Sequence, residues 1–363
     1  MDLSIDVFVV TLGVLSAVLL RWAFKTLPRE GSQVLASVPM EKADSGTWSG
    51  LNITYYGVLV AFACTVALGL SVLLLGSLGL DGRVALLLVV GLFGICFPAS
   101  WVIARLVEKK RHTLTVSGAS FLGFLSAPLV VWPADVVAEW LSWPRIPAVP
   151  TLAALAVAYA VGEGLGRLAC ISFGCCYGKP LSACPSWIAR PFARYAFVFE
   201  GKTRKIAYEG SLDGQPVLPI QAITSIIYLS AGLVGTWLFL KGFQTAALVL
   251  CAVITQAWRV VSEVFRADYR GDRSWSAYQV FSGLAVCYLI AILFFLPRHA
   301  TSAPNLFQGL TAWWDPITIL SLQAVFVVTF LVTARSKVTG STITLFVHES
   351  AVHSDQAAGS RGQ

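Results

Sequence analysis

The chain has 363 residues, of which 56% are hydrophobic and only 12% are charged, whereas ordinary soluble domains have roughly 25% charged residues. This composition excludes a soluble enzyme. The net charge is +7, and the charged residues cluster between long uncharged stretches, which predicts an all-α polytopic membrane protein with its charges at the ends of its spans.

Nine segments are apolar enough to cross a bilayer, whose hydrocarbon core needs about 20 residues per helix. In chain order they are residues 7–20, 45–80, 84–104, 113–134, 146–162, 214–240, 242–258, 274–297 and 316–334. The first has the length of a signal-peptide core, but it lacks a basic start and a small-residue cleavage site, so we expect an uncleaved span. Segment 45–80 is longer than one crossing requires.

The sizeable hydrophilic stretches are residues 25–44, residues 167–213 and the chain after residue 335, and no separate soluble domain is predicted. Residues 190–209 mix basic and aromatic side chains. This mixture is typical of a belt at the membrane interface, which we favour, or of an arm that guides a substrate. The polar tail after Lys337 is predicted to be disordered.

A carboxylate and a guanidinium group stand at the end of the span that begins near residue 146. Glu163 and Arg167 are four residues apart, so they share one helical face in the orientation that favours an ion pair. Ionisable residues inside a membrane are costly and indicate a functional site, although a pair that merely ends the helix is the alternative. The neighbouring glycines allow a helix or a lipid headgroup to approach the backbone.

A second charged cluster ends the span 242–258. Arg259, Glu263 and Arg266 recur at spacings of four and three, so all three can lie on one face of a helix. Guanidinium groups bind phosphate oxygens in a bidentate manner, whereas a basic rim that anchors the helix is the alternative. Together the two clusters predict a site for a phospholipid phosphate, without telling whether the lipid is a substrate.

Eight cysteines fall into two groups. Four lie inside predicted spans, where a lone cysteine behaves as a small hydrophobe: Cys64, Cys96, Cys251 and Cys287. The other four crowd into fifteen residues: Cys170, Cys175, Cys176 and Cys184. A zinc site requires two separated cysteine pairs or nearby histidines, so no metal site is predicted, and tight packing is favoured over a redox pair.

Several motifs resemble those of the prolipoprotein diacylglyceryl transferase family. The family signature, a Gly-Arg followed by a glycine-bearing stretch, a further Gly and a basic residue, is matched by Gly166, Arg167, Gly178 and Lys179. Further motifs occur in the family's order: Tyr55-Tyr56-Gly57 at the first core helix, Pro219 and Gln221 before a span, Arg259 with Glu263 and Arg266 at a helix end, and Gln279 with Ser282 opening the last core helix.

The resemblance also implies a domain organisation of about seven core transmembrane helices plus one extra at each end. We expect an extra N-terminal span and polar loop at 1–52 and a transferase-like core at 53–296 with an interfacial arm at 167–213. An extra C-terminal span at 297–337 and a disordered tail at 338–363 follow.

The chain departs from the family's pattern at three places. Cys170 stands where the family has Asn, and Cys175 stands where it has Glu. The family's His-Gly-Gly motif is replaced by Leu122-Gly123-Phe124, and no histidine lies in any predicted span. Glu163 is a candidate replacement for the missing base, because a carboxylate inside a membrane can have a raised pKa.

The resemblance implies transfer of the diacylglyceryl group of phosphatidylglycerol to the lipobox cysteine thiol of a lipoprotein precursor, in the bacterial cytoplasmic (inner) membrane and without a cofactor, a metal or a nucleic acid. Catalytic roles fall to Arg167 and Arg259 as phosphate ligands, Glu263 as the group that orients Arg259, and Glu163 or Glu263 as the base. The expected substrate-binding residues are Tyr56, Arg266, Gly166, Gly178, Gln221 and Gln279. Two alternatives stay open: a phospholipid transferase with a different acceptor, and a non-catalytic lipid-binding membrane protein.

The orientation in the membrane is predicted differently by two arguments. Lys and Arg are concentrated on the side that carries the predicted site, which the positive-inside rule assigns to the cytoplasm. The family resemblance implies that this side is extracytoplasmic. We favour the second orientation, because arginines that bind lipid phosphate increase the positive count for a functional reason.

Overall fold

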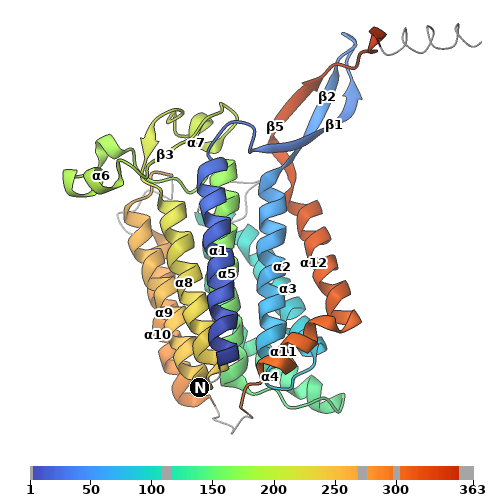
Figure 1. Cartoon of the computed structure of the whole chain (residues 1–363), viewed down its shortest axis with the longest axis vertical. Coiled ribbons are helices and arrows are strands. Elements are labelled where there is room, and N and C mark those ends of the chain that lie inside the picture. The colour runs from blue at the N-terminus through green and yellow to red at the C-terminus, as the bar shows by residue number, and fades with distance from the viewer. Residues whose placement is uncertain (1–2, 108–115, 269–275, 297–302, 351–363) are drawn as a thin grey trace, which may run out of the picture.

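The computed structural model describes residues 3–107, 116–268, 276–296 and 303–350. Within these ranges nine helices are long and apolar enough to cross a membrane, which confirms the predicted all-α polytopic architecture. They are α1 (Leu3–Thr26), α2 (Tyr55–Gly76), α3 (Gly82–Val107), α4 (Val116–Trp140), α5 (Ala148–Phe173), α8 (Ile220–Leu240), α9 (Gln244–Val264), α10 (Ala277–Phe295) and α12 (Pro316–Thr333). The helices stand together as one bundle (Figure 1).

Helix α5 is the most buried of these spans and packs against α2, α8 and α9. Its small residues allow this packing. A Cβ atom added to Gly162 would lie 2.8 Å from the Ala67 side chain of α2, and one added to Gly164 would lie 3.0 Å from Leu229 of α8. Membrane helices associate through such close contacts, because lipid supplies no hydrophobic force between them. The charged residues of α5 therefore lie in the interior of the bundle.

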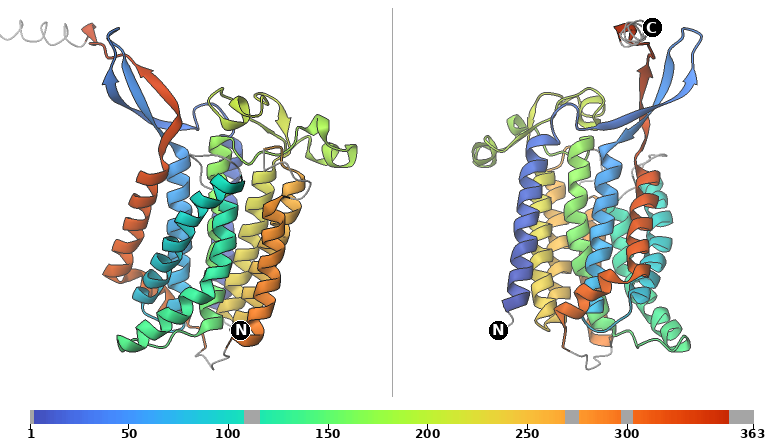
Figure 2. Two further views of the ribbon diagram at one scale, coloured as in Figure 1. Left: turned by 180° about the vertical axis from the view of Figure 1, so that it is seen from behind. Right: turned by 45° about the vertical axis from the view of Figure 1, so that its right-hand side comes forward.

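Helices α1 and α12 form the outer part of the bundle and bury little of their surface. The two views in Figure 2 show α12 on the side of α2, away from α9 and α10. Apolar side chains of α1, such as Val7, Leu15 and Val18, are more than half exposed, as expected for a helix that faces lipid. The short helices α11 (Leu306–Thr311) and η2 (Ala312–Trp314) lead into α12.

A three-stranded antiparallel sheet extends beyond one end of the bundle (Figure 1). It contains β1 (Val34–Lys42), β2 (Trp48–Thr54) and β5 (Arg335–Ile343) in the order β1-β2-β5. The side chain of Asn52, which is buried in β2, accepts hydrogen bonds from Ser37 of β1 and Ser341 of β5. The sheet therefore joins the segment before α2 to the segment after α12.

The sheet corrects two predictions. The predicted disorder of residues 338–363 is wrong for 338–343, because β-branched residues such as Val338 and Thr342 suit a strand and this segment pairs with β2. Residues 351–363 lie outside the described residues. Segment 45–80 is not one long span: its first part is β2, and α2 begins at Tyr55. Similarly, the span predicted at 214–240 begins only at Ile220, directly after Pro219.

Residues 174–219 cover the end of the bundle from which the sheet extends (Figure 1). This cover segment contains η1 (Leu181–Ala183), α6 (Ser186–Phe192), β3 (Phe197–Val198), α7 (Lys205–Tyr208) and β4 (Pro216–Val217). Its anchor is Arg204, which is 1% exposed and donates to the carbonyl oxygens of Ile171 at 3.2 Å and Ser172 at 2.5 Å. Since the last carbonyls of a helix have no intrahelical partner, Arg204 caps α5 and attaches the cover segment to it.

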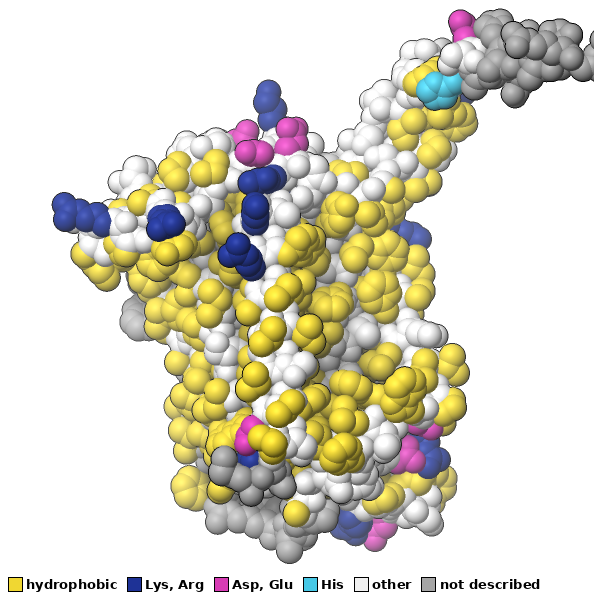
Figure 3. Space-filling view, in the orientation of Figure 1, with side chains coloured by type: hydrophobic (Ala, Val, Ile, Leu, Met, Phe, Trp, Pro, Cys, Tyr) yellow, Lys and Arg dark blue, Asp and Glu magenta, His cyan; other side chains and the backbone are white. Residues whose placement is uncertain are grey.

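Charge is distributed unevenly over the surface shown in Figure 3. Hydrophobic side chains cover the lateral face of the bundle, and Lys and Arg gather toward the end with the cover segment. This pattern marks the bundle as the membrane-embedded part and the two ends as its polar boundaries.

Candidate functional site

A polar pocket lies between α5, α8 and α9 near the covered end of the bundle. It is lined by Arg167, Cys176, Ile220, Gln221, Thr224, Tyr228, Arg259, Ser262 and Arg266. Arg167 is six residues before the end of α5, a distance of about 9 Å along a helix. The pocket therefore reaches below the end of the helix into the membrane-embedded part of the bundle.

The predicted ion pair between Glu163 and Arg167 is confirmed, and it has a third member. Oε1 of Glu163 accepts from Nη2 of Arg167 and also from Nη2 of Arg259, at 3.2 Å. The same nitrogen of Arg259 donates to the Tyr159 hydroxyl at 2.6 Å. Glu163 and Tyr159 lie on one face of α5, because they are four residues apart. A single carboxylate thus holds two guanidinium groups from two helices.

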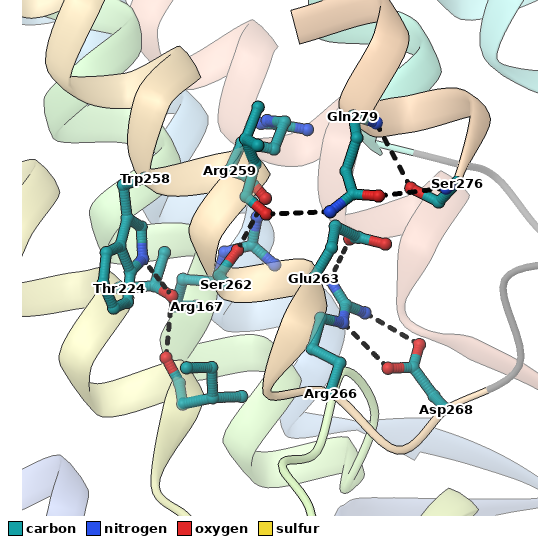
Figure 4. Close-up of polar contacts among 12 residues, drawn as sticks. Arg167, Thr224, Trp258, Arg259, Ser262, Glu263, Arg266, Asp268, Ser276 and Gln279 are labelled. Atoms are coloured by element: carbon teal, nitrogen blue, oxygen red, sulfur yellow. Dashed lines mark hydrogen bonds and ion pairs between the residues drawn. The ribbon is translucent and has the colours of Figure 1, made fainter. Parts of the chain in front are cut away.

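The prediction that Glu263 orients Arg259 is wrong. Glu263 pairs with Arg266 at 3.4 Å, and Asp268 accepts from Nε and Nη2 of Arg266 at 2.8 and 2.7 Å, as Figure 4 shows. The spacing along α9 gave Glu263 two candidate partners, one four residues before it and one three residues after it. The carboxylate that meets Arg259 comes instead from α5.

Two arginines present hydrogen-bond donors that have no partner among the described residues. These buried donors are Nε of Arg167 and both Nε and Nη1 of Arg259. The Oε1 atom of Gln221 is a buried acceptor that likewise has no donor among the described residues. A buried guanidinium nitrogen without an acceptor costs free energy. The arrangement therefore suits an anionic ligand with several oxygens, such as a phosphodiester.

The segment after α5 turns back sharply and brings three thiol groups together. Gly174 ends α5 in the left-handed conformation with φ 71°, and the Cys175 N–H donates to the Cys170 carbonyl at 3.0 Å. Cys176 also has a positive φ, 56°. As a result the sulfur atoms of Cys170, Cys175 and Cys176 all lie within 4.8 Å of one another. The three thiols form a cluster that could hold a metal ion, and the expected tight packing of the cysteines stays a prediction.

Two titratable groups next to the pocket have shifted pKa values. Burial raises the pKa of Asp268 to about 6, although the neighbouring Arg266 opposes the shift. Hydrogen bonds with Cys170 and Cys175 lower the pKa of Cys176 well below its ordinary value, and Arg266 contributes in the same direction.

The structure separates the predicted site residues into two groups. Arg167, Gln221, Arg259 and Arg266 line the pocket, with Glu163 directly behind two of them. The remaining predicted residues are absent from the described lining: Glu263, Tyr56, Gly166, Gly178 and Gln279.

Several of these remaining residues have clear local roles. Tyr56 packs edge-on against Phe173, with ring centroids 5.6 Å apart. Gln279 completes the capping box of α10 with Ser276, as Figure 4 shows. It also donates to the Val260 carbonyl at 3.1 Å. Both polar atoms of the Gln279 amide are thus used to fix α10 against α9.

The two signature glycines differ in their surroundings. A Cβ atom on Gly178 would collide with the carbonyl oxygen of Leu218, because Gly178 forms a β-bridge with Arg266 and its chain passes directly beside Leu218. Gly178 therefore allows the close approach of three backbone segments next to the pocket. A Cβ atom on Gly166 would meet nothing within 4 Å.

Pocket residues that the sequence analysis missed come mainly from α8. Thr224 and Tyr228 follow the predicted Gln221 at spacings of three and four, so they share one face of that helix with it. Tyr228 is fully buried and donates to the Thr255 carbonyl at 2.7 Å. In the sequence these residues form a polar stripe on an otherwise apolar span, which could have indicated the pocket. The analysis missed them because it searched the spans for charged residues, and none of these residues is charged.

Comparison with known proteins agrees with the motifs. The family model described as prolipoprotein diacylglyceryl transferase matches residues 47–296, a range that contains every pocket residue and begins just before β2. No curated protein and no solved structure gives a significant match. Since the family model covers more than half of the chain, this membrane protein belongs to the prolipoprotein diacylglyceryl transferase family.

Proposed function

We propose that the protein transfers the diacylglyceryl group of phosphatidylglycerol to a cysteine thiol of a lipoprotein precursor, in the cytoplasmic membrane of a bacterium. The observation that carries this proposal is the pair Arg167 and Arg259, which line the pocket and carry buried nitrogens that have no hydrogen-bond partner among the described residues. Family membership supplies the type of reaction. In this proposal the phosphate of the lipid donor binds to these two arginines.

The reaction forms one bond and breaks another. The thiolate sulfur of the acceptor attacks the glycerol carbon of the diacylglyceryl group, and the bond between that carbon and the phosphate oxygen breaks. The electron pair leaves with glycerol phosphate. Arginines fixed around the phosphate stabilise the charge that develops on it, which is often the largest contribution to such catalysis.

Glu163 has a positioning role in this proposal. Its carboxylate receives two guanidinium groups, and its side chain is only 6% exposed. Both of its partners, Arg167 and Arg259, line the pocket. The ion pairs therefore favour Glu163 as the group that orients Arg167 and Arg259, in place of the base that the sequence suggested.

The test is an assay of the purified chain in detergent with phosphatidylglycerol and a lipobox peptide, read by mass spectrometry. We expect a diacylglyceryl adduct on the peptide cysteine. Arg259→Ala is expected to lower the rate by about 10²- to 10³-fold, the loss typical of one removed transition-state donor. Arg145→Ala is the matched control, because Arg145 is an exposed arginine between α4 and α5, and its activity should equal that of the unchanged protein.

Other outcomes of this assay identify the alternatives. Release of glycerol phosphate without a peptide adduct would indicate a phospholipid transferase with another acceptor. Binding of phosphatidylglycerol with no product of either kind would indicate a lipid-binding protein. Equal loss of activity in Arg259→Ala and Arg145→Ala would contradict the assignment of the pocket.

A further inference from the structure

We propose that Cys170, Cys175 and Cys176 form a zinc site whose open coordination position binds the acceptor thiol. This inference deepens the transferase reaction proposed above and rests on it. The three sulfurs lie within 4.8 Å of one another. Three thiolates around Zn²⁺ with bonds of about 2.3 Å would place the sulfurs about 3.8 Å apart, so small side-chain adjustments suffice.

The backbone around the cluster is held in place by other elements. The Gly174 carbonyl accepts from the Ile206 N–H at 2.9 Å, and the Cys175 carbonyl accepts from Nε2 of Gln221 at 2.9 Å. The Tyr177 carbonyl accepts from the Ala267 N–H at 3.1 Å. The carbonyl groups of the loop are therefore fixed to α7, to α8 and to the chain that follows α9. Such preorganisation is required of a metal site.

The backbone strain at Cys176 has an explanation in this site. A non-glycine residue with positive φ is in a strained backbone conformation, and such residues tend to persist at functional positions. The turn at Cys176, together with that at Gly174, brings three sulfurs from seven consecutive residues to one point. Simple packing of small side chains requires neither turn.

The charge around the cluster favours a thiolate-bound metal. Zn²⁺ with three thiolates carries a net charge of −1. Arg167 and Arg266 line the same pocket as Cys176, and Lys205 interacts electrostatically with Cys175 and Cys176. Soft thiolate ligands select zinc or copper(I) over magnesium or calcium. Zinc is assigned because it is redox-inert and, with three protein ligands, keeps an open position for a substrate.

The site would supply a step that the described pocket residues do not. The pocket lining contains no histidine, and Glu163, the carboxylate behind it, is paired with two arginines. Coordination to zinc deprotonates a thiol outright, and the released proton passes to water. The bound sulfur then forms the carbon–sulfur bond while glycerol phosphate departs. The thioether product is neutral and a weaker ligand, so it leaves the metal.

The first experiment measures metal in the purified, reduced full chain in detergent. We expect about one zinc per chain by mass spectrometry, and cobalt substitution should give thiolate charge-transfer bands and a tetrahedral spectrum. Cys170→Ala and Cys176→Ala should lose at least nine-tenths of the metal. Cys184→Ala, which changes a cysteine outside the cluster, should lose none. Cys176→His should keep the metal, because histidine binds zinc and tolerates positive φ.

The second experiment adds lipobox peptides to the cobalt-substituted protein. A cysteine peptide should shift the cobalt spectrum, and the matching serine peptide should not. Absence of metal from the reduced protein, or a disulfide within the cluster that persists under reducing conditions, would overturn the zinc site. Bound metal with no response to the cysteine peptide would overturn the binding of the acceptor.

The two proposals fail in different ways. Full transfer activity in metal-free protein would overturn the zinc inference and leave the transferase intact. Zinc binding with the peptide-dependent spectral shift, but without any adduct from phosphatidylglycerol, would support the thiol site and contradict the diacylglyceryl transfer.

Discussion

Three arginines surround the pocket, and their partners divide them into two kinds. Arg266 directs all three of its side-chain nitrogens to Glu263 and Asp268. Arg167 and Arg259 instead share the single carboxylate of Glu163, so their part of the pocket carries a net charge of +1. A phosphodiester carries one negative charge. The pairing therefore leaves one cationic charge where one anionic group is expected.

We expect the ionisation of Asp268 to make lipid binding dependent on pH. Its pKa is about 6 because of burial, so it is ionised at pH 8 and protonated at pH 5. Protonation removes a negative charge from Arg266 and makes the pocket more positive. We expect phosphatidylglycerol to bind several-fold more tightly at pH 5 than at pH 8, an effect of roughly 1 kcal/mol for one charge near the site.

Equilibrium binding of a fluorescent phosphatidylglycerol at the two pH values measures this effect. No acceptor peptide is present, so the ionisation of its thiol does not contribute. Asp268→Asn mimics the protonated form and should bind tightly at both values. Asp135→Asn is the control, since Asp135 lies on α4 and pairs with Arg145. A pH dependence that persists in Asp268→Asn would contradict the assignment.

Local spacing predicted part of the site. The pair Glu163 and Arg167 is visible in the sequence, because both residues lie on one helix at a spacing that fixes their geometry. The contact between Glu163 and Arg259 is not visible, because it depends on how α9 packs against α5. The thiol cluster was missed for a different reason: it requires two residues with positive φ, and one of them is a cysteine.

At the scale of the elements, the end of α5 depends on Arg204. This side chain reaches the carbonyls of Ile171 and Ser172, and it also donates to the Arg29 carbonyl in the chain after α1. One residue of the cover segment thus ties α1 and α5 together. The helix end that it caps is the one from which the cysteine loop begins.

We expect Arg204→Ala to destabilise the protein strongly. The change removes the donor of the buried Ser172 carbonyl and one of the two donors of the Ile171 and Arg29 carbonyls, at a cost of about 2–4 kcal/mol. A thermal-shift measurement in detergent should show a melting temperature lower by several degrees. Arg190→Ala removes an exposed arginine of α6 in the same segment and should melt like the unchanged protein. Equal melting of both variants would show that Arg204 is not the anchor.

The spans were predictable as elements, whereas the sheet was not. Apolar length alone identifies a membrane helix, because the bilayer sets the minimum. Strand β5 has no such signal: it is polar and rich in Ser and Thr, and its partner β2 is far away in the sequence. The sequence also offered no boundary between β2 and α2, since the residues on both sides of Tyr55 are uncharged.

At the scale of the whole molecule, the pocket, the cover segment and the sheet all occupy one end of the bundle. This end also carries most of the basic residues that Figure 3 displays. The positive-inside rule and the family resemblance assign this end to opposite sides of the membrane. We propose that it faces outward, because the lipoprotein precursors that it would modify are exported proteins.

Labelling of single cysteines tests this orientation in intact cells. Ser186→Cys lies exposed at the start of α6, and we expect a membrane-impermeant maleimide to label it from outside. Ser142→Cys, exposed between α4 and α5 at the other end, should react only after the membrane is opened. Both variants carry Cys184→Ser, and the protein with Cys184→Ser alone gives the background labelling of the remaining cysteines. The reverse pattern would place the pocket on the cytoplasmic side.

The pairing of β5 with β2 has a consequence for biogenesis. Asn52 and Ser341 are in contact although 289 residues separate them along the chain, and contacts of such long range form late in folding. During synthesis β2 is made early and can pair only with β1, so one of its edges stays open until the last strand emerges. The sheet can therefore close only after all the intervening helices have been synthesised, and a chain that ends before β5 would display an unpaired edge of β2, which is a template for association with other chains.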